Sequence, residues 1–392
     1  MGDRTPEGGT RPVRLALAAA MAVVGFYVLR ELPAEFTRLI ADPDAYAGID
    51  LQLRLREVSG WWSGENVYKT RAHAVYPPSA YLLLRPLFVS LEWPVVRQVW
   101  GAWSALLLVV AAWGCVRGAG MTSWLGRIFA VLLPLALAGT AHGIGNGQVS
   151  LLCTVAAVGS VLLVAREDAG WGTDLLAAGL FMLALIKPTM TAPFFWLICF
   201  LPGRWRPALL VLAGFGALTW ASTLLVPEEG LLLLVARFVD RAVEGARYGA
   251  TDGGTVNVQT VLGFAQMSMH SPVAALALVG GAGAWAAGRP TRDPWILMGV
   301  MGIAARIAFY HRSYDDLTVV PALIALARIA TRSDDRRLAG LAGGLLVLTW
   351  LIMSVVPLGP LSGIADGAMW VCWVGAAGLL VVASQREQPP TG

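Results

Sequence analysis

Lysine is almost absent from this 392-residue chain, which contains it only at Lys69 and Lys187. Charged residues of all kinds make up 14% of the sequence, whereas a soluble globular domain carries about 25%. No cluster of basic residues resembles a nucleic-acid-binding surface, so no nucleic-acid partner is expected. The shortage of charge, together with 57% hydrophobic residues, predicts an integral membrane protein with several spans.

Cysteine is also scarce. The four cysteines lie in or beside apolar runs and form no CxxC or Cys/His pattern, so neither disulfides nor zinc is expected. Two carboxylate pairs, Asp42-Pro43-Asp44 and Asp315-Asp316, have spacings that are common by chance, and Pro43 favours a simple turn. We therefore predict neither a metal site nor a cofactor.

Long apolar runs are what the chain has in abundance, and 16 tryptophans accompany them, as is typical of membrane interfaces. A span needs ~20 apolar residues. Apolar length predicts about twelve spans, at 14–32, 95–116, 125–141, 148–165, 173–187, 189–202, 207–226, 271–288, 293–309, 315–330, 338–356 and 366–384. Residues 173–202 could also form one broken helix, and 78–90 is short enough to be re-entrant or interfacial. The predicted fold class is an all-α polytopic membrane protein.

Arginine is distributed unevenly among the predicted connectors. With a cytoplasmic N-terminus and an uncleaved first span, most arginines lie inside, and the outer connectors 142–147 and 357–365 contain no Lys or Arg. The long loops 33–94 and 227–270 then face outside, as do 187–188 and 310–314. We predict one transmembrane domain over 14–384 between cytoplasmic tails at 1–13 and 385–392.

The polar segment 48–86 contains a lone acidic residue, Asp50, ahead of an amphipathic stretch. Apolar residues recur there at helical spacing, with Arg54 and Glu57 on the other side, a pattern typical of a helix on the membrane surface. Asp50 could cap that helix. Alternatively, it could act as a general base whose pKa is raised by partial desolvation at the membrane boundary.

Two further polar segments could shape a site. Tyr76-Pro77-Pro78 predicts a turn with Pro78 in the first turn of a helix over 79–90, and loop architecture is the simpler interpretation of it. The segment from His142 to Gln148 contains three glycines that allow close backbone approach. Asn146 and Gln148 within it offer neutral hydrogen bonds that suit hydroxyl-rich ligands, unless the segment is only a capped turn.

The cationic candidates lie at predicted outer ends of spans. Lys187 precedes Pro188 and could bind a lipid phosphate or simply extend to the interface. Arg306 is followed by His311, which lies beside carboxylates and could be an acid/base group, a phosphate ligand or part of a helix-cap cluster. Asn257 and Gln259 follow a charged, helix-like stretch in the second long loop.

The order of these elements resembles glycosyltransferase family 87. The resemblance runs over about 48–320 and rests on W-x-G-x-x-x-Y and Y-P-P, on G-N-G-Q at 145–148, and on Lys187-Pro188, Asn257-Val-Gln259 and His311. The family comprises membrane enzymes of the GT-C fold, including polyprenyl-phosphate-mannose-dependent mannosyltransferases.

The resemblance implies an inverting hexosyl transfer at the outer face of the cell membrane, within the lipid bilayer. The donor would be a polyprenyl-phosphate sugar, with mannose as the expected sugar, the acceptor a glycolipid or glycan, and no nucleotide would be needed. Asp50 would be the base, with His311 as a second catalytic group, and Lys187, Arg306 and His311 would stabilise the donor phosphate. The implied sugar and acceptor ligands are Tyr76, Asn146, Gln148, Asn257 and Gln259.

Two alternatives stay open at the level of sequence. One is a transporter or flippase of polyprenyl-linked sugars, although the chain has no internal repeat and few ionisable residues at span centres. The other is a non-catalytic assembly partner.

Overall fold

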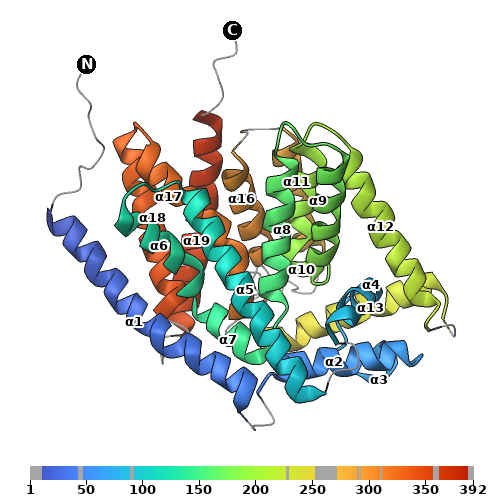
Figure 1. Ribbon diagram of the computed structural model, residues 1–392. Coiled ribbons are helices and arrows are strands. Elements are labelled where there is room, and N and C mark those ends of the chain that lie inside the picture. Colours follow the sequence, from blue (N-terminus) through green and yellow to red (C-terminus); the bar gives the residue numbers. More distant parts are fainter. Residues whose placement is uncertain are drawn as a thin grey trace.

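The computed structural model describes residues 11–42, 47–88, 92–226, 229–251, 272–288, 291, 293–309, 311–355 and 362–386. All regular structure within these ranges is helical. Most helices stand side by side between two ends of a bundle, and a second group lies across the lower end (Figure 1). The predicted tails fall almost entirely outside the described residues.

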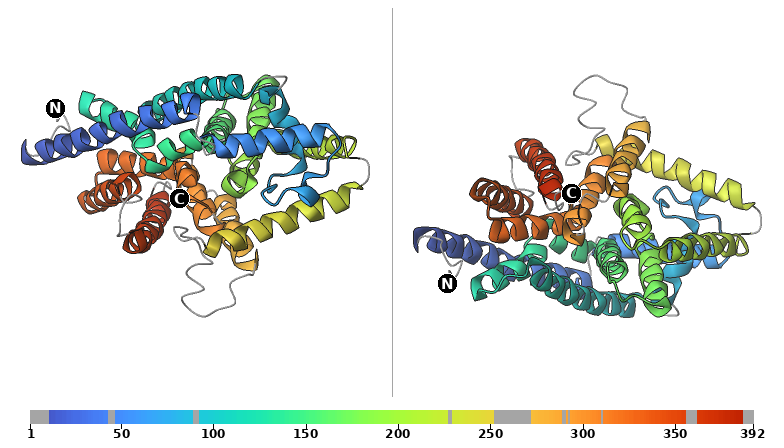
Figure 2. Two further views of the ribbon diagram at one scale, coloured as in Figure 1. Left: turned by 90° about the horizontal axis from the view of Figure 1, so that it is seen from below. Right: turned by 90° about the horizontal axis from the view of Figure 1, so that it is seen from above.

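The longer helices of the bundle are α1 (Arg11–Ala41), α5 (Trp93–Ala119), α12 (Arg206–Thr223), α18 (Arg336–Val355) and α19 (Ser362–Arg386). Its shorter elements are α6 (Trp124–Leu135), α7 (Ala138–Asn146), α8 (Ser150–Val164), α9 (Trp171–Ala184), α10 (Pro188–Thr191), η1 (Ala192–Phe194), α11 (Phe195–Phe200), α15 (Pro272–Ala287), α16 (Pro294–Ala308), η2 (Ser313–Val319) and α17 (Val320–Arg332). The helices at the lower end are α2 (Ile49–Trp62), α3 (Val67–Thr70), α4 (Pro78–Phe88) and α13 (Leu231–Thr251). Figure 2 shows α2 and α13 from below, crossing the end of the bundle.

Every predicted span coincides with helical structure, but few of these helices are long. Among the described residues, Trp93–Ala119, Arg336–Ser354 and Gly367–Arg386 are long and apolar enough to cross a membrane. A fourth candidate is the α6–α7 pair, which is bent by 45°. Several other apolar helices have only 10–17 residues, shorter than the ~20 that a bilayer core requires. The structure therefore supports an all-helical membrane protein, and the count of twelve spans stays a prediction.

Proline determines where several helices break. Pro188 begins α10 after α9 has ended at Ala184, so the predicted break within 173–202 is present. Lys187 between them has φ −125° and ψ 77°, outside the helical region, as expected for a residue before proline. Pro78 opens α4 as the sequence predicts. The break between α9 and α10 leaves Lys187 on an irregular segment inside the bundle.

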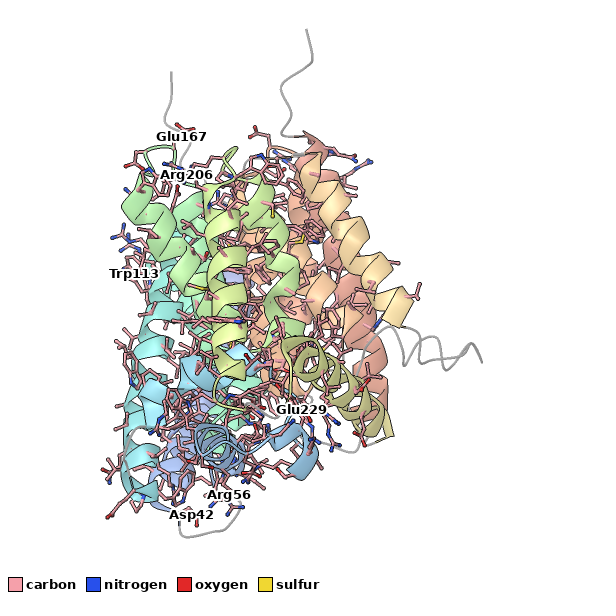
Figure 3. All side chains as sticks on the ribbon, turned by 90° about the vertical axis from the view of Figure 1, so that its right-hand side faces the viewer. Asp42, Arg56, Trp113, Glu167, Arg206 and Glu229 are labelled. Carbon is pink, nitrogen blue, oxygen red and sulfur yellow. The ribbon has the colours of Figure 1, made fainter. Side chains whose placement is uncertain are left out.

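The flanks of the bundle are apolar and its two ends are polar. On α5, Val109 and Trp113 are more than 60% exposed, an arrangement that suits contact with lipid. At the upper end, Arg204 and Arg206 pair with the buried Asp174 at 2.8 and 3.1 Å. Figure 3 shows Glu167 and Arg206 at that end, and Asp42, Arg56 and Glu229 at the opposite one.

Candidate active site

The carboxylate of Asp315 joins three segments that are distant in sequence. Its Oδ1 atom lies 2.6 Å from Lys187 Nζ and accepts a hydrogen bond from Ser150 Oγ at 2.5 Å. Its Oδ2 atom lies 3.1 Å from His311 Nδ1. Asp315 is 2% exposed, so the charge of Lys187 balances a carboxylate that is removed from solvent. The end of α9, the start of α8 and η2 therefore meet at this pair.

Lys187 keeps part of its binding capacity free. An ammonium group has three N–H donors, and two of them are directed at Asp315 and, at 3.3 Å, at Ser150. The Lys187 Nζ atom lies 4.9 Å from the centre of the Tyr314 ring, and the side chain is 13% exposed. Within the described part of the chain, the third donor has no hydrogen-bond partner.

His311 and Arg306, both predicted to contact a donor phosphate, lie in the core behind Lys187. Both are 1% exposed. His311 Nε2 lies 3.2 Å from the carbonyl oxygen of Ala305, so both ring nitrogens are engaged. Burial lowers the pKa of His311, and the hydrogen bond and charge of Asp315 oppose this effect. This geometry suits a group that orients Asp315.

Arg306 is held in a different way. Its Nε atom donates to Asp316 at 2.6 Å, and its guanidinium lies 4.7 Å from the ring centre of Trp373. Because Arg306 is almost completely buried, its predicted role as a phosphate ligand gains no support from its position.

The G-N-G-Q segment connects the site to α2. Residues 142–146, predicted to belong to a connector between two spans, are helical: α7 continues to Asn146, and the chain turns only at Gly147, which has φ +71°. The backbone N–H of Gly48 donates to the carbonyl of Gly145 at 3.0 Å. A Cβ atom on Gly147 would lie 2.4 Å from Leu51 Cβ. This close contact holds the first turn of α2 against the end of α7.

Substitution of Gly147 tests this contact. We expect Gly147→Ala to lower the free energy of unfolding by about 2–5 kcal/mol, because a left-handed non-glycine residue costs roughly 1–2 kcal/mol and overpacking costs about 1–3 kcal/mol. Gly203→Ala is the matched control, since Gly203 has φ +65° but no atom within 4 Å of the added Cβ. Equal losses in thermal unfolding of the two variants would show that the contact with α2 is not tight.

The two amides of this segment have different surroundings. Asn146 Oδ1 accepts a hydrogen bond from Arg38 Nη2 at 2.8 Å, which ties α7 to α1. Gln148 is 8% exposed, and its Oε1 atom has no partner in the described part of the chain. Gln148 and Tyr314 both flank Gly143, so Gln148 lies close to Tyr314.

Asp50 lies inside α2 and does not cap it. The N-cap position is Gly48, and Asp50 is in the first turn. Asp50 is half-buried, and none of the described residues forms a hydrogen bond or ion pair with its carboxylate. Burial raises the pKa of the Tyr314 hydroxyl, and the charges of Asp315 and Asp50 raise it further. Asp50 is therefore close to the residue that covers Lys187.

Tyr76 is a second link between Asp50 and the Asp315 pair. Burial raises the pKa of its hydroxyl; Arg54 opposes this effect, and Asp50 and Asp315 both add to it. The backbone of Tyr76 is fixed by the hydroxyl of Tyr68, which donates to the Tyr76 carbonyl at 2.6 Å. We therefore treat Asp50, Tyr76, Tyr314 and Lys187 as one candidate site.

The remaining predicted ligands, Asn257 and Gln259, lie outside the described residues. Asp44 of the first carboxylate pair, to which no role was assigned, lies outside them as well. Among the residues that the structure describes, no group of three or more His, Cys, Asp or Glu side chains could hold a metal ion.

Comparison with known proteins identifies the family to which the chain belongs. The profile of glycosyltransferase family 87 matches residues 74–320, which is more than half of the chain. The chain belongs to glycosyltransferase family 87. No match was found among curated proteins or among solved structures. The resemblance seen in the motif order is thus confirmed, and the protein is a glycosyltransferase. The match includes Tyr76, Lys187 and His311, whereas Asp50 precedes it.

In this family 87 glycosyltransferase, sequence reasoning missed the central carboxylate. Asp315 was noticed only as half of a carboxylate pair, and Ser150 and Tyr314 were assigned no role. The available signal was the run Tyr314-Asp315-Asp316 directly after His311, since a histidine four residues before an aspartate can meet it across one helical turn. For Ser150 the sequence carries no signal.

Proposed function

We propose that this glycosyltransferase moves a hexose, with mannose as the first candidate, from polyprenyl phosphate to a hydroxyl of a glycolipid or glycan. One observation carries the proposal. A half-buried carboxylate with no hydrogen-bond or ion-pair partner among the described residues, Asp50, and a cation with a free donor, Lys187, lie near the same tyrosine, Tyr314. A base and an anion-binding group are what such a transfer needs.

The reaction uses these groups in one displacement. The Asp50 carboxylate takes the proton of the acceptor hydroxyl, whose oxygen attacks the anomeric carbon of the donor sugar. The bond between that carbon and the phosphate oxygen breaks, and the electron pair leaves with the lipid phosphate. The free N–H of Lys187 stabilises the added negative charge, which is largest in the transition state. Attack opposite to the leaving group inverts the anomeric configuration.

The leaving group already carries a phosphate, so we propose that neither a nucleotide nor a metal ion takes part. Gln148 and Tyr76, both buried beside the site, are proposed to hydrogen-bond sugar hydroxyls. Asn146, which is bonded to Arg38, is proposed to act through the position of α7. Asn257 and Gln259 remain proposed ligands from the second long loop.

The arrangement of charge supports an outer-face site. Arg206 and Arg204, which pair with the same Asp174, lie at the upper end, opposite to α2 and the site (Figures 1 and 3). Membrane proteins keep arginine-rich connectors in the cytoplasm. We therefore propose a GT-C-type protein of about twelve spans, with both termini cytoplasmic and the site open to the outer leaflet.

The test is a transfer assay with the purified full-length protein. It would be given polyprenyl-phosphate-[¹⁴C]mannose and a membrane glycolipid extract, with EDTA in half of the samples, and parallel reactions would contain the corresponding glucose and arabinose donors. We expect labelled glycolipid from the mannose donor at equal rates with and without EDTA. Donor binding without transfer to any acceptor would favour a flippase or a non-catalytic partner. Transfer that requires a sugar nucleotide would overturn the proposal.

A further inference from the structure

Helix α2 presents a stripe of polar and aromatic side chains to α4 and to the turn before it. Asp50, Arg54, Glu57 and Trp61 recur at intervals of four, three and four residues, which places them along one face. Arg54 is 5% exposed, Glu57 is 1% exposed and Trp61 is fully buried. Arg54 and Glu57, predicted to lie on the side of the helix opposite to its apolar residues, are therefore buried as well. The stripe leads from Asp50 at the site into the core of the lower end.

Arg54 has two carboxylates within reach on its own helix. Asp50 lies four residues before it, the spacing at which acidic and basic side chains pair on a helix. Arg54 instead pairs with Glu57, with 2.7 Å between Nη1 and Oε2. Its guanidinium lies 4.3 Å from the ring centre of Tyr76, and Nη2 donates to the carbonyl of His73 at 3.1 Å. No ion pair between Arg54 and Asp50 forms within the described residues.

Whether Arg54 pairs with Glu57 or with Asp50 matters for the proposed role of Asp50 as a base. An arginine within about 4–6 Å of an aspartate lowers the pKa of that aspartate by roughly 1–3 units, which weakens it as a base. Other charged or titratable groups near Asp50 are Tyr76, before α4, and Tyr314 in η2. Arg54 is the cation nearest to Asp50 along α2, so its position decides whether Asp50 has an ion-pair partner on that helix.

Glu57 lies in a pocket that opposes its ionisation. Burial raises its pKa to about 7. Arg54 and, from the end of α3, Arg71 lower this pKa, as does the nearby hydroxyl of Tyr81 on α4, whereas the charge of Asp50 raises it. Tyr81 and Trp61 stack with ring centres 4.9 Å apart and close the pocket. Loss of a proton by Glu57 near neutral pH would complete the pair with Arg54.

We propose that Glu57 is a positioning residue that holds Arg54 against Tyr76 and away from Asp50, so that the Asp50 carboxylate stays free to accept a proton. This inference rests on the proposed function, because it takes Asp50 as the base. Neutralising Glu57 releases Arg54 to pair with Asp50, which leaves the fold in place but weakens the base.

The test compares the pH dependence of kcat in four full-length proteins: wild type, Glu57→Gln, Glu57→Asp and the double variant Arg54→Gln/Glu57→Gln. In the wild type we expect kcat to rise through about pH 7 as Glu57 ionises. Glu57→Gln is expected to lose that transition and to be roughly tenfold slower at pH 8. Glu57→Asp, which keeps the charge, is expected to keep the transition.

The double variant separates this role from a purely structural one. Removing Arg54 as well frees Asp50 again, so the double variant is expected to be faster than Glu57→Gln at pH 8. A merely structural pair would make the double variant as slow as the single one or slower. That result, or an unchanged pH profile in Glu57→Gln, would overturn the inference.

A second measurement does not depend on activity. Carbodiimide labelling of Asp50 at pH 7.5, followed by peptide mass spectrometry, reports whether its carboxyl group is free. We expect several-fold less labelling of Asp50 in folded Glu57→Gln than in the wild type, and recovery in the double variant. Equal labelling in all three would refute the inference. If the wild type transfers no sugar, the proposed function fails, and this labelling still decides whether Glu57 controls the partner of Arg54.

Discussion

Asp50→Asn is expected to reduce sugar transfer by roughly 10²–10⁴-fold, the usual contribution of a general base. Asparagine has the size of aspartate but cannot take a proton from the acceptor hydroxyl. The fold is expected to survive, because no described residue pairs with the Asp50 carboxylate. A negative charge in the first turn of a helix contributes only about 0.3–1 kcal/mol. Initial rates of transfer and thermal unfolding of the same preparation measure both effects.

Glu92→Gln is the matched control for Asp50→Asn. Glu92 precedes α5, is exposed, and makes no capping hydrogen bond, so its replacement removes a carboxylate outside the site. We expect a transfer rate within twofold of the wild type for this control, roughly the change that a surface substitution causes. Normal transfer by a folded Asp50→Asn protein would show that Asp50 is not the base.

Lys187→Met is expected to have the second largest effect, on both stability and activity. It leaves the buried Asp315 without its cation, which typically costs about 3–5 kcal/mol, and it removes the donor that we assign to the lipid phosphate. Thermal unfolding and initial rates would both decrease. Because unfolding alone could abolish transfer, this variant does not separate the two roles of Lys187.

The double variant Lys187→Met/Asp315→Asn separates them. Asparagine removes the unpaired charge but keeps an acceptor for Ser150, so most of the lost stability is expected to return. Transfer is expected to stay at least roughly 100-fold below the wild type, the scale of losing one transition-state donor. A double variant that transfers sugar at the wild-type rate would show that Lys187 only neutralises Asp315.

Helix positions followed from local rules and were largely predictable. Apolar runs matched helices, Pro78 opened α4, and Pro188 separated α9 from α10. These effects depend on the backbone of a few adjacent residues. The connector at 142–147 was misplaced, because a glycine-rich segment can remain helical when close packing favours it. In α7, Gly139 and Gly143 allow η2 to approach so closely that a Cβ on Gly139 would overlap the Ser313 carbonyl.

The surroundings of the charged residues were not predictable in the same way. The amphipathic pattern of α2 shows that one face is apolar, but it contains no information on what covers the other face. Arg54 and Glu57 are buried because the Tyr76-Pro77-Pro78 turn and α4 pack over them. Likewise, Lys187 was predicted as a phosphate ligand without its partner, since Asp315 is 128 residues away.

The sequence by itself determined that this is a helical membrane protein, where its helices lie, and the family to which it belongs. Composition, apolar run length and the order of short motifs are properties of the chain alone. The tertiary structure decided which ionisable groups are paired and which are free: Lys187 and Arg54 have carboxylate partners, and Asp50 has none among the described residues. A buried charge is stable only beside a partner, and the partner of Lys187 reaches it only when distant segments pack together.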